Sequence, residues 1–174
     1  MAPLRAGAKL PDITLPTTDG TQLSLAQRTG RSVLAVYPWT GSPGQPNPPR
    51  WDDIPGAHGS TPELMGFRDR MPDFARVGIN LYGLSRQTSD YQIELVRRLD
   101  LPFPILSDAA GRFTTALDLP TFDTGGVTYF ARLTPVILDG VIERVFFPIA
   151  DPATHAGEVL TGLQSESSSA SSTE

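Results

Sequence analysis

Apolar residues recur along this chain in two patterns: continuous runs, and stretches in which apolar positions lie three or four residues apart. Continuous runs are typical of strands that are buried on both faces of a sheet. Residues 32–37 form such a run, and residues 79–84 are expected to be the next buried strand. Residues 102–106 are expected to form a short extended piece, and two further strands are expected at residues 133–138 and 141–147. The last two flank the turn Asp139-Gly140 and predict a hairpin, in which Pro135 is expected to introduce a kink or a cis peptide bond. A smaller hairpin is expected around the turn at residues 18–21.

The second pattern predicts helices that each bury one apolar face. Helices are expected to begin at Ser60, at Asp108 and at either Asp151 or Pro152, and Ser89 is expected to cap a further helix that runs to about Leu99. In the first helix, Ser60 is interpreted as the N-cap and Glu63 as its capping-box partner, and Pro72 is expected to kink or shorten the helix. The last helix is expected to end near Leu163, and the serine-rich residues 164–174 are expected to form a disordered tail.

This order of strands and helices predicts an α/β fold with one domain, residues 1–163, in which helices flank both faces of a mixed central sheet. Residues 38–59 interrupt the pattern, since they hold six of the 17 prolines and both tryptophans, Trp39 and Trp51. Tryptophan is uncommon in flexible linkers, so this segment is interpreted as a long ordered loop. The two tryptophans either pin the loop to the surface or line a pocket.

The composition and net charge of the chain exclude several classes of reaction and partner. The chain contains no cysteine, which excludes disulfides, thiolate metal sites, iron–sulfur clusters and a cysteine nucleophile. A net charge of −5 disfavours binding to nucleic acid. The sequence has no apolar run long enough for a transmembrane helix, and its first residues do not resemble a signal peptide. We therefore expect a cytoplasmic protein whose partners are neither nucleic acids nor membranes.

Several segments resemble, in the same order, those of peroxiredoxins of the bacterioferritin-comigratory type. They are Gly83-Leu-Ser85, residues 101–108 with Gly111, Arg132 to Ile142, and Tyr37-Pro38. In addition, Gly59-Ser-Thr-Pro-Glu63 and Gly66-Phe-Arg-Asp69 are similar to the family's active-site run, Gly-Cys-Thr-x-x-x-Cys-Gly-Phe-Arg-Asp. The resemblance spans about residues 7–163. It implies a thioredoxin-like fold with an N-terminal β-hairpin, in which the proline- and tryptophan-rich loop is an insertion.

The resemblance also implies where the chemistry should lie. In this family a cysteine thiolate at a helix N-terminus attacks the peroxide O–O bond, and an arginine and a threonine help to hold the peroxide. The peroxidatic cysteine falls on Ser60, the resolving cysteine on Met65 and the arginine on Arg132. The spacing that would place the threonine is broken by the inserted loop. The resemblance further implies a peroxide-like substrate and a monomer or homodimer.

Two of these positions cannot perform the family's reaction. A serine hydroxyl cannot pass through sulfenic acid and disulfide, and a helix dipole worth roughly 0.3–2 kcal/mol cannot make it a substantial alkoxide. We therefore predict that the chain, although related by resemblance to an oxidoreductase, is inactive as a thiol peroxidase. Natural loss of the cysteines and their deliberate replacement both fit the sequence.

Other interpretations of the same residues stay open. Ser60 could form a hydrolase triad with His58 and either Asp52 or Asp53, or it could act only as an N-cap. The two histidines, His58 and His155, lack the spacing of a metal motif, so neither a metal nor a cofactor is expected.

Arg132 has two interpretations. It could form a structural salt bridge with a carboxylate such as Asp69, or it could anchor a small anion beneath the helix that starts at Ser60. The second interpretation leads to an alternative function, in which a repurposed thioredoxin-like protein binds a small ligand or catalyses a cofactor-free, non-redox reaction. Its pocket would be built around Ser60 and Arg132 by Pro38, Trp39, Trp51, His58 and Thr61.

Overall fold

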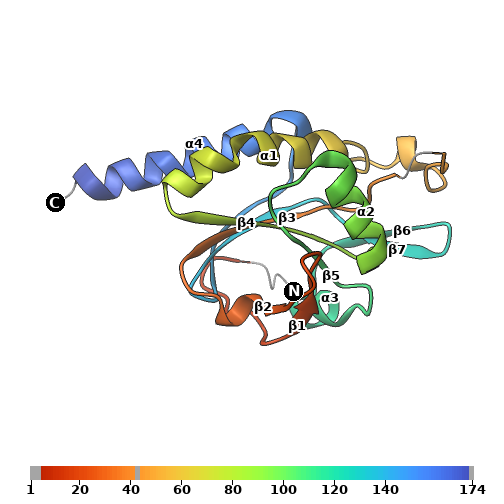
Figure 1. The fold of residues 1–174 in the computed structure, drawn as a ribbon, viewed down its shortest axis with the longest axis horizontal. Coiled ribbons are helices and arrows are strands. Elements are labelled where there is room, and N and C mark those ends of the chain that lie inside the picture. Colours follow the sequence, from red (N-terminus) through yellow and green to blue (C-terminus); the bar gives the residue numbers. More distant parts are fainter. Residues whose placement is uncertain (1–4, 42–43, 173–174) are drawn as a thin grey trace.

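Five strands form the central sheet in the order β5-β4-β3-β8-β9 (Figure 1). Their bounds are Arg31–Val36 for β3, Ile79–Ser85 for β4, Ile105–Ser107 for β5, Thr134–Leu138 for β8 and Val141–Phe146 for β9. Strands β3, β4 and β5 are parallel, whereas β8 is antiparallel to both β3 and β9, so the sheet is mixed as predicted. This computed structural model describes residues 5–41 and 44–172.

Two hairpins lie outside the central sheet. The first, β1 (Thr14–Pro16) with β2 (Gln22–Ser24), is the predicted N-terminal hairpin. The second, β6 (Thr121–Thr124) with β7 (Val127–Phe130), was not predicted. Its residues are mostly exposed or half-buried, so it lacks the continuous apolar run that marks a strand buried on both faces.

Four α-helices flank the sheet: α1 (Ser60–Arg76), α2 (Ser89–Leu99), α3 (Arg112–Leu117) and α4 (Pro152–Ser172). Helices α1 and α4 lie side by side on one face (Figure 1). They contribute with α2 to one hydrophobic core, while α3 and the first hairpin contribute to a second core on the opposite face. Two 3-10 turns, η1 (Leu25–Gln27) and η2 (Trp51–Asp53), complete the elements assigned to the described residues.

The helix bounds differ from the predictions in two places. Helix α1 contains Pro72 and continues through it to Arg76, so this proline does not shorten the helix. Helix α4 runs on through Ser172 and projects past the sheet in Figure 1, where the sequence predicts a helix end near Leu163 and a disordered tail. Residues 173–174 of that tail lie outside the described residues.

The predicted capping box at the start of α1 is wrong. The N-cap is Gly59, in the left-handed region at φ 109°, and the cap makes no side-chain hydrogen bond. A Cβ atom on Gly59 would lie 2.7 Å from Cγ of Pro152, at the start of α4. Glycine therefore serves this position both by its conformation and by its lack of a side chain. Ser60 becomes the first residue of the helix and is free of the capping role.

Two further local predictions are corrected. Helix α2 has Thr88 as its N-cap rather than Ser89. Helix α3 begins later than Asp108, whose carboxylate instead accepts hydrogen bonds from the N–H groups of Phe113 and Thr114. In the hairpin of β8 and β9, the register shifts between Val136 and Ile137, and the cis bond lies at Phe147-Pro148 rather than at Pro135.

His155 joins α4 to the sheet. Its side chain is buried, with Nε2 2.8 Å from the Thr134 hydroxyl on β8, and its ring packs edge-on against Phe67 and Phe146. Burial, and to a lesser extent the charge of Arg132, lowers the pKa of His155 from 6.5 to about 4. The imidazole is therefore neutral in the folded protein at pH values where it would be protonated in the unfolded chain.

This difference predicts a loss of stability in acid. Below about pH 6.5 the unfolded state binds a proton at His155 that the folded state does not, so the free energy of unfolding should fall as the pH approaches 4. In His155→Gln, which keeps a polar group beside Thr134, this contribution should disappear. Urea denaturation of both proteins across that range measures it, and an identical pH dependence of the two proteins would contradict the prediction.

Candidate functional site

The first residue of α1 carries a buried hydroxyl group. Ser60 is 4% exposed, and its Oγ has no hydrogen-bond partner among the described residues. It stands at the N-terminus of a 17-residue helix, where the first N–H groups have no intrahelical acceptor and the helix dipole favours negative charge. Pro62 has no N–H, and the N–H of Glu63 donates to the Gly59 carbonyl. The helix start therefore offers the N–H groups of Ser60 and Thr61.

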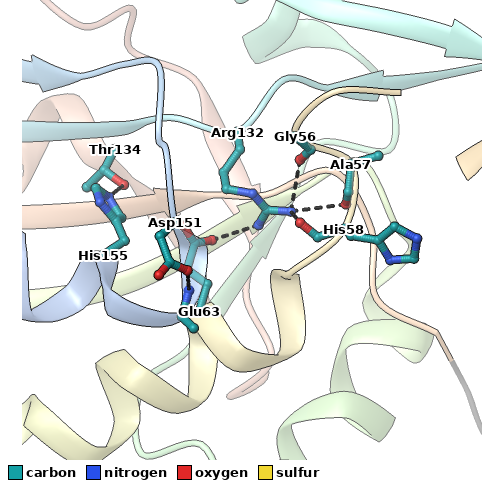
Figure 2. A network of polar contacts seen from close by, with 9 residues as sticks. Gly56, Ala57, His58, Glu63, Arg132, Thr134, Asp151 and His155 are labelled. Atoms are coloured by element: carbon teal, nitrogen blue, oxygen red, sulfur yellow. Dashed lines mark hydrogen bonds and ion pairs between the residues drawn. The ribbon is translucent and has the colours of Figure 1, made fainter. Parts of the chain in front are cut away.

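Arg132 lies behind this helix start and binds two parts of the chain at once. Its Nη1 is 3.0 Å from Oε1 of Glu63, in a salt bridge whose side chains are 2% and 0% exposed. Its Nη2 donates to the backbone carbonyls of Gly56, Ala57 and His58, at 3.2, 3.1 and 3.1 Å (Figure 2). The guanidinium group thus holds the end of the inserted loop against α1.

Arg132 does form a buried salt bridge, but its partner is Glu63 and not the expected Asp69. Asp69 pairs instead with Arg68, at 2.9 Å, on the exposed side of α1. Sequence reasoning assigned Glu63 to a capping box, and its position three residues after Ser60 does not reveal that its side chain turns inward. Burial raises the pKa of Glu63, and the neighbouring Arg132 guanidinium opposes that rise.

A hollow of about 310 Å³ opens beside the start of α1. It is lined by Trp39, Thr40, Gly41, Asn47, Trp51, Ala57, His58, Gly59, Ser60, Thr61 and Pro62. Five of the eight candidate site residues are therefore brought together, namely Trp39, Trp51, His58, Ser60 and Thr61. The other three, Pro38, Met65 and Arg132, are not among its lining residues. Thr40 and Asn47 line it without any sequence signal to single them out.

The two tryptophans form one wall of the hollow. Their rings meet edge to face with centroids 5.4 Å apart. Trp51 is 3% exposed, and it also packs against Phe122 and Tyr129 on the β6–β7 hairpin, at 5.7 and 5.2 Å. Trp51 therefore fixes the inserted loop to the hairpin and lines the hollow at the same time, so the two roles considered for it are compatible.

The His58 side chain points away from Arg132 (Figure 2) and is 56% exposed. Its Nε2 contacts Oδ1 of Asp52, and both side chains are largely exposed. The contacts of the described residues pair His58 with Asp52 and not with Ser60, so they do not form the complete triad. Within these same residues no group of three or more potential metal ligands gathers, and no helix is long and apolar enough to cross a membrane.

Comparisons of the sequence with known proteins identify the family of this chain. The Redoxin family matches residues 5–157. Chloroplastic peroxiredoxin Q of Oryza sativa subsp. japonica is 30% identical over 161 residues, which are 91% of this chain and 66% of the rice protein. Peroxiredoxin bcp1 of Schizosaccharomyces pombe is 30% identical over 116 residues, 66% of this chain and 52% of the yeast protein. The chain thus spans slightly less than two thirds of the rice protein's length and about half of the yeast protein's.

Solved structures agree with this placement. The crystal structure of peroxidoxin BcpB from Mycobacterium tuberculosis has a TM-score of 0.74 at 25% identity, covering 93% of this chain and 97% of that one. A cysteine-to-serine mutant of Xylella fastidiosa PrxQ has a TM-score of 0.76 at 22% identity, covering 94% and 98%, and shows the same fold. The fold is therefore thioredoxin-like, and this chain belongs to the Redoxin family, as a cysteine-free relative of the peroxiredoxins of the bacterioferritin-comigratory type.

Proposed function

We propose that this chain does not reduce hydroperoxides through a thiol and instead binds a small, oxygen-bearing ligand in the hollow beside Ser60. One observation carries the proposal: at the position that the resemblance assigns to the peroxidatic cysteine stands a buried hydroxyl without a partner, and its residue lines the hollow. An unpaired buried polar group costs about 1–3 kcal/mol, and a ligand oxygen at this place would remove that cost.

The chemistry of the remaining residues supports binding rather than redox turnover. The chain has no cysteine to form a sulfenic acid or a disulfide. Met65, at the resolving position, is half-buried on α1 and does not line the hollow. The terminal nitrogens of Arg132 bind Glu63 and three loop carbonyls, and its Nε is buried without a partner among the described residues. Arg132 does not line the hollow, whereas Ser60 and Thr61 do, so their N–H groups are the donors best placed for a ligand.

The lining residues indicate the class of ligand. The helix N-terminus and the Ser60 hydroxyl favour a carboxylate, a peroxide-like oxygen or another small oxygen acceptor. The Trp39 and Trp51 rings favour an apolar or aromatic body next to that group. A volume of about 310 Å³ is at the lower end of the roughly 300–1,000 Å³ of small-molecule sites, so the ligand is small. The expected monomer or homodimer and the cytoplasmic location stay predictions.

The absence of thiol chemistry is tested with hydrogen peroxide and dithiothreitol. The native chain should consume peroxide no faster than a no-protein control. Ser60→Cys should consume it at least about tenfold faster than Ser89→Cys, which places a cysteine at the first residue of another helix without the hollow. Turnover by the native chain would contradict the proposal, and equal rates for the two variants would show that the hollow no longer activates a thiol.

Ligand binding is tested by tryptophan fluorescence, because both tryptophans of the chain line the hollow. Titration with benzoate should change the emission saturably, and the neutral isostere benzamide should bind more weakly. Ser60→Ala removes one hydrogen bond, worth about 0.5–1.5 kcal/mol, and should weaken benzoate binding by roughly 2- to 10-fold. Ser89→Ala, on α2, should bind as the native chain does. An emission that responds to neither compound contradicts a site for small carboxylates.

A further inference from the structure

The inserted loop brings an aspartate and a histidine together at the rim of the hollow. Asp52 lies in the 3-10 turn η2, His58 lies two residues before Ser60, and Nε2 of His58 contacts Oδ1 of Asp52. His58 is among the residues that line the hollow, and Asp52 is not. The pair contributes nothing to the core, since the side chains of His58 and Asp52 are 56% and 81% exposed. Both side chains are therefore accessible to solvent at the edge of the hollow.

The backbone on both sides of the pair is held in place. The carbonyl oxygen of His58 accepts a hydrogen bond from Nη2 of the buried Arg132, at 3.1 Å. Asp52 follows Trp51, whose ring is buried against Phe122 and Tyr129. The backbone of both residues is therefore held by buried contacts, although their side chains reach solvent. A fixed backbone limits the rearrangement needed to bring the imidazole to a bound ligand.

The contact with Asp52 determines which nitrogen of the ring can act as a base. A carboxylate only accepts hydrogen bonds, so Nε2 of the neutral imidazole carries the proton and Nδ1 is the acceptor. The aspartate thereby orients the ring and leaves Nδ1 as the nitrogen that can accept a proton. Ser60 and Thr61 line the same hollow as His58, and their N–H groups at the start of α1 form a pair of donors suited to an oxyanion.

We propose that the hollow hydrolyses small esters, with His58 as the general base for an attacking water molecule and Asp52 as its positioning residue. The inference rests on the proposed function, because the ester must first bind in the hollow. His58 takes a proton from water as the new C–O bond forms, and the carbonyl oxygen becomes an oxyanion that the Ser60 and Thr61 N–H groups hold. The bond to the leaving oxygen then breaks, His58 returns the proton to that oxygen, and a carboxylic acid and an alcohol are released.

Water, rather than the Ser60 hydroxyl, is the nucleophile in this scheme. The Ser60 Oγ is buried and has no partner in the described part of the chain, so no base is in place to take its proton. The exposed imidazole is open to solvent water. The mechanism therefore predicts that no acyl group accumulates on the protein.

Hydrolysis of 4-nitrophenyl acetate, followed by release of 4-nitrophenolate, tests the inference. The native chain should turn over the ester above an equal concentration of free imidazole. His58→Gln should lose about 100-fold or more of kcat, in the range that general bases contribute. Asp52→Asn should lower kcat by about tenfold or more with little change in KM, since it disturbs the orientation of His58 and not the binding of the ester. Asp53→Asn, the neighbouring exposed carboxylate, is the matched control and should retain the native rate.

The outcomes separate this inference from the proposed function. Full activity of His58→Gln, activity of the native chain no higher than that of imidazole, or an acetyl group on Ser60 detected by mass spectrometry would each overturn it. Benzoate titration of His58→Gln, read by tryptophan fluorescence, shows independently whether the hollow still binds. If the native chain binds benzoate saturably but does not hydrolyse the ester, only the proposed hydrolysis is contradicted. If the native chain does not bind benzoate, both the proposed binding site and the proposed hydrolysis are contradicted.

Discussion

The candidate site depends on one buried cation. The guanidinium group of Arg132 is withdrawn from water and is compensated by the carboxylate of Glu63 and by the carbonyls of residues 56–58. Removing one partner of such a buried pair typically costs about 3–5 kcal/mol, because the other charge is left uncompensated. These contacts join Arg132, just before β8, to the helix α1 and to the end of the inserted loop, which lie 69 to 76 residues earlier in the sequence. The start of α1 and the shape of the hollow therefore depend on this cation.

The same contacts give Arg132 a counter-charge that does not depend on residue 60. A thiolate at the start of α1 would be an anion that a neighbouring cation could stabilise, whereas the hydroxyl of Ser60 is neutral and needs no counter-charge. Arg132 is instead neutralised by Glu63 on one side and bound by carbonyl dipoles on the other. The neutral Ser60 hydroxyl is therefore compatible with the buried pair, since the charge of Arg132 is already opposed by that of Glu63.

A feature could be predicted from the sequence where neighbouring residues determine it, and was missed where a residue distant in the sequence does. Strands β3 and β4 were predicted because both of their faces are buried, and such burial imposes a continuous apolar run. The β6–β7 hairpin was missed because most of its residues are exposed or half-buried, and its contacts with Trp51 and Pro49 come from a loop distant in the sequence. The cap at Gly59 and the partner of Arg132 were also predicted wrongly. Each depends on a residue distant in sequence, Pro152 in one case and Glu63 in the other, and no local pattern reports such a contact.

The hollow combines contributions of two kinds. The scaffold shared with the Redoxin family supplies the helix start, with its N–H groups and the buried hydroxyl of Ser60. The inserted loop supplies Trp51, the carbonyls that hold Arg132, and the pair of Asp52 and His58. The loop lines the hollow with Trp39, Trp51 and His58, and the helix start lines it with Ser60 and Thr61. Both proposals therefore concern the place where the loop and the helix start meet.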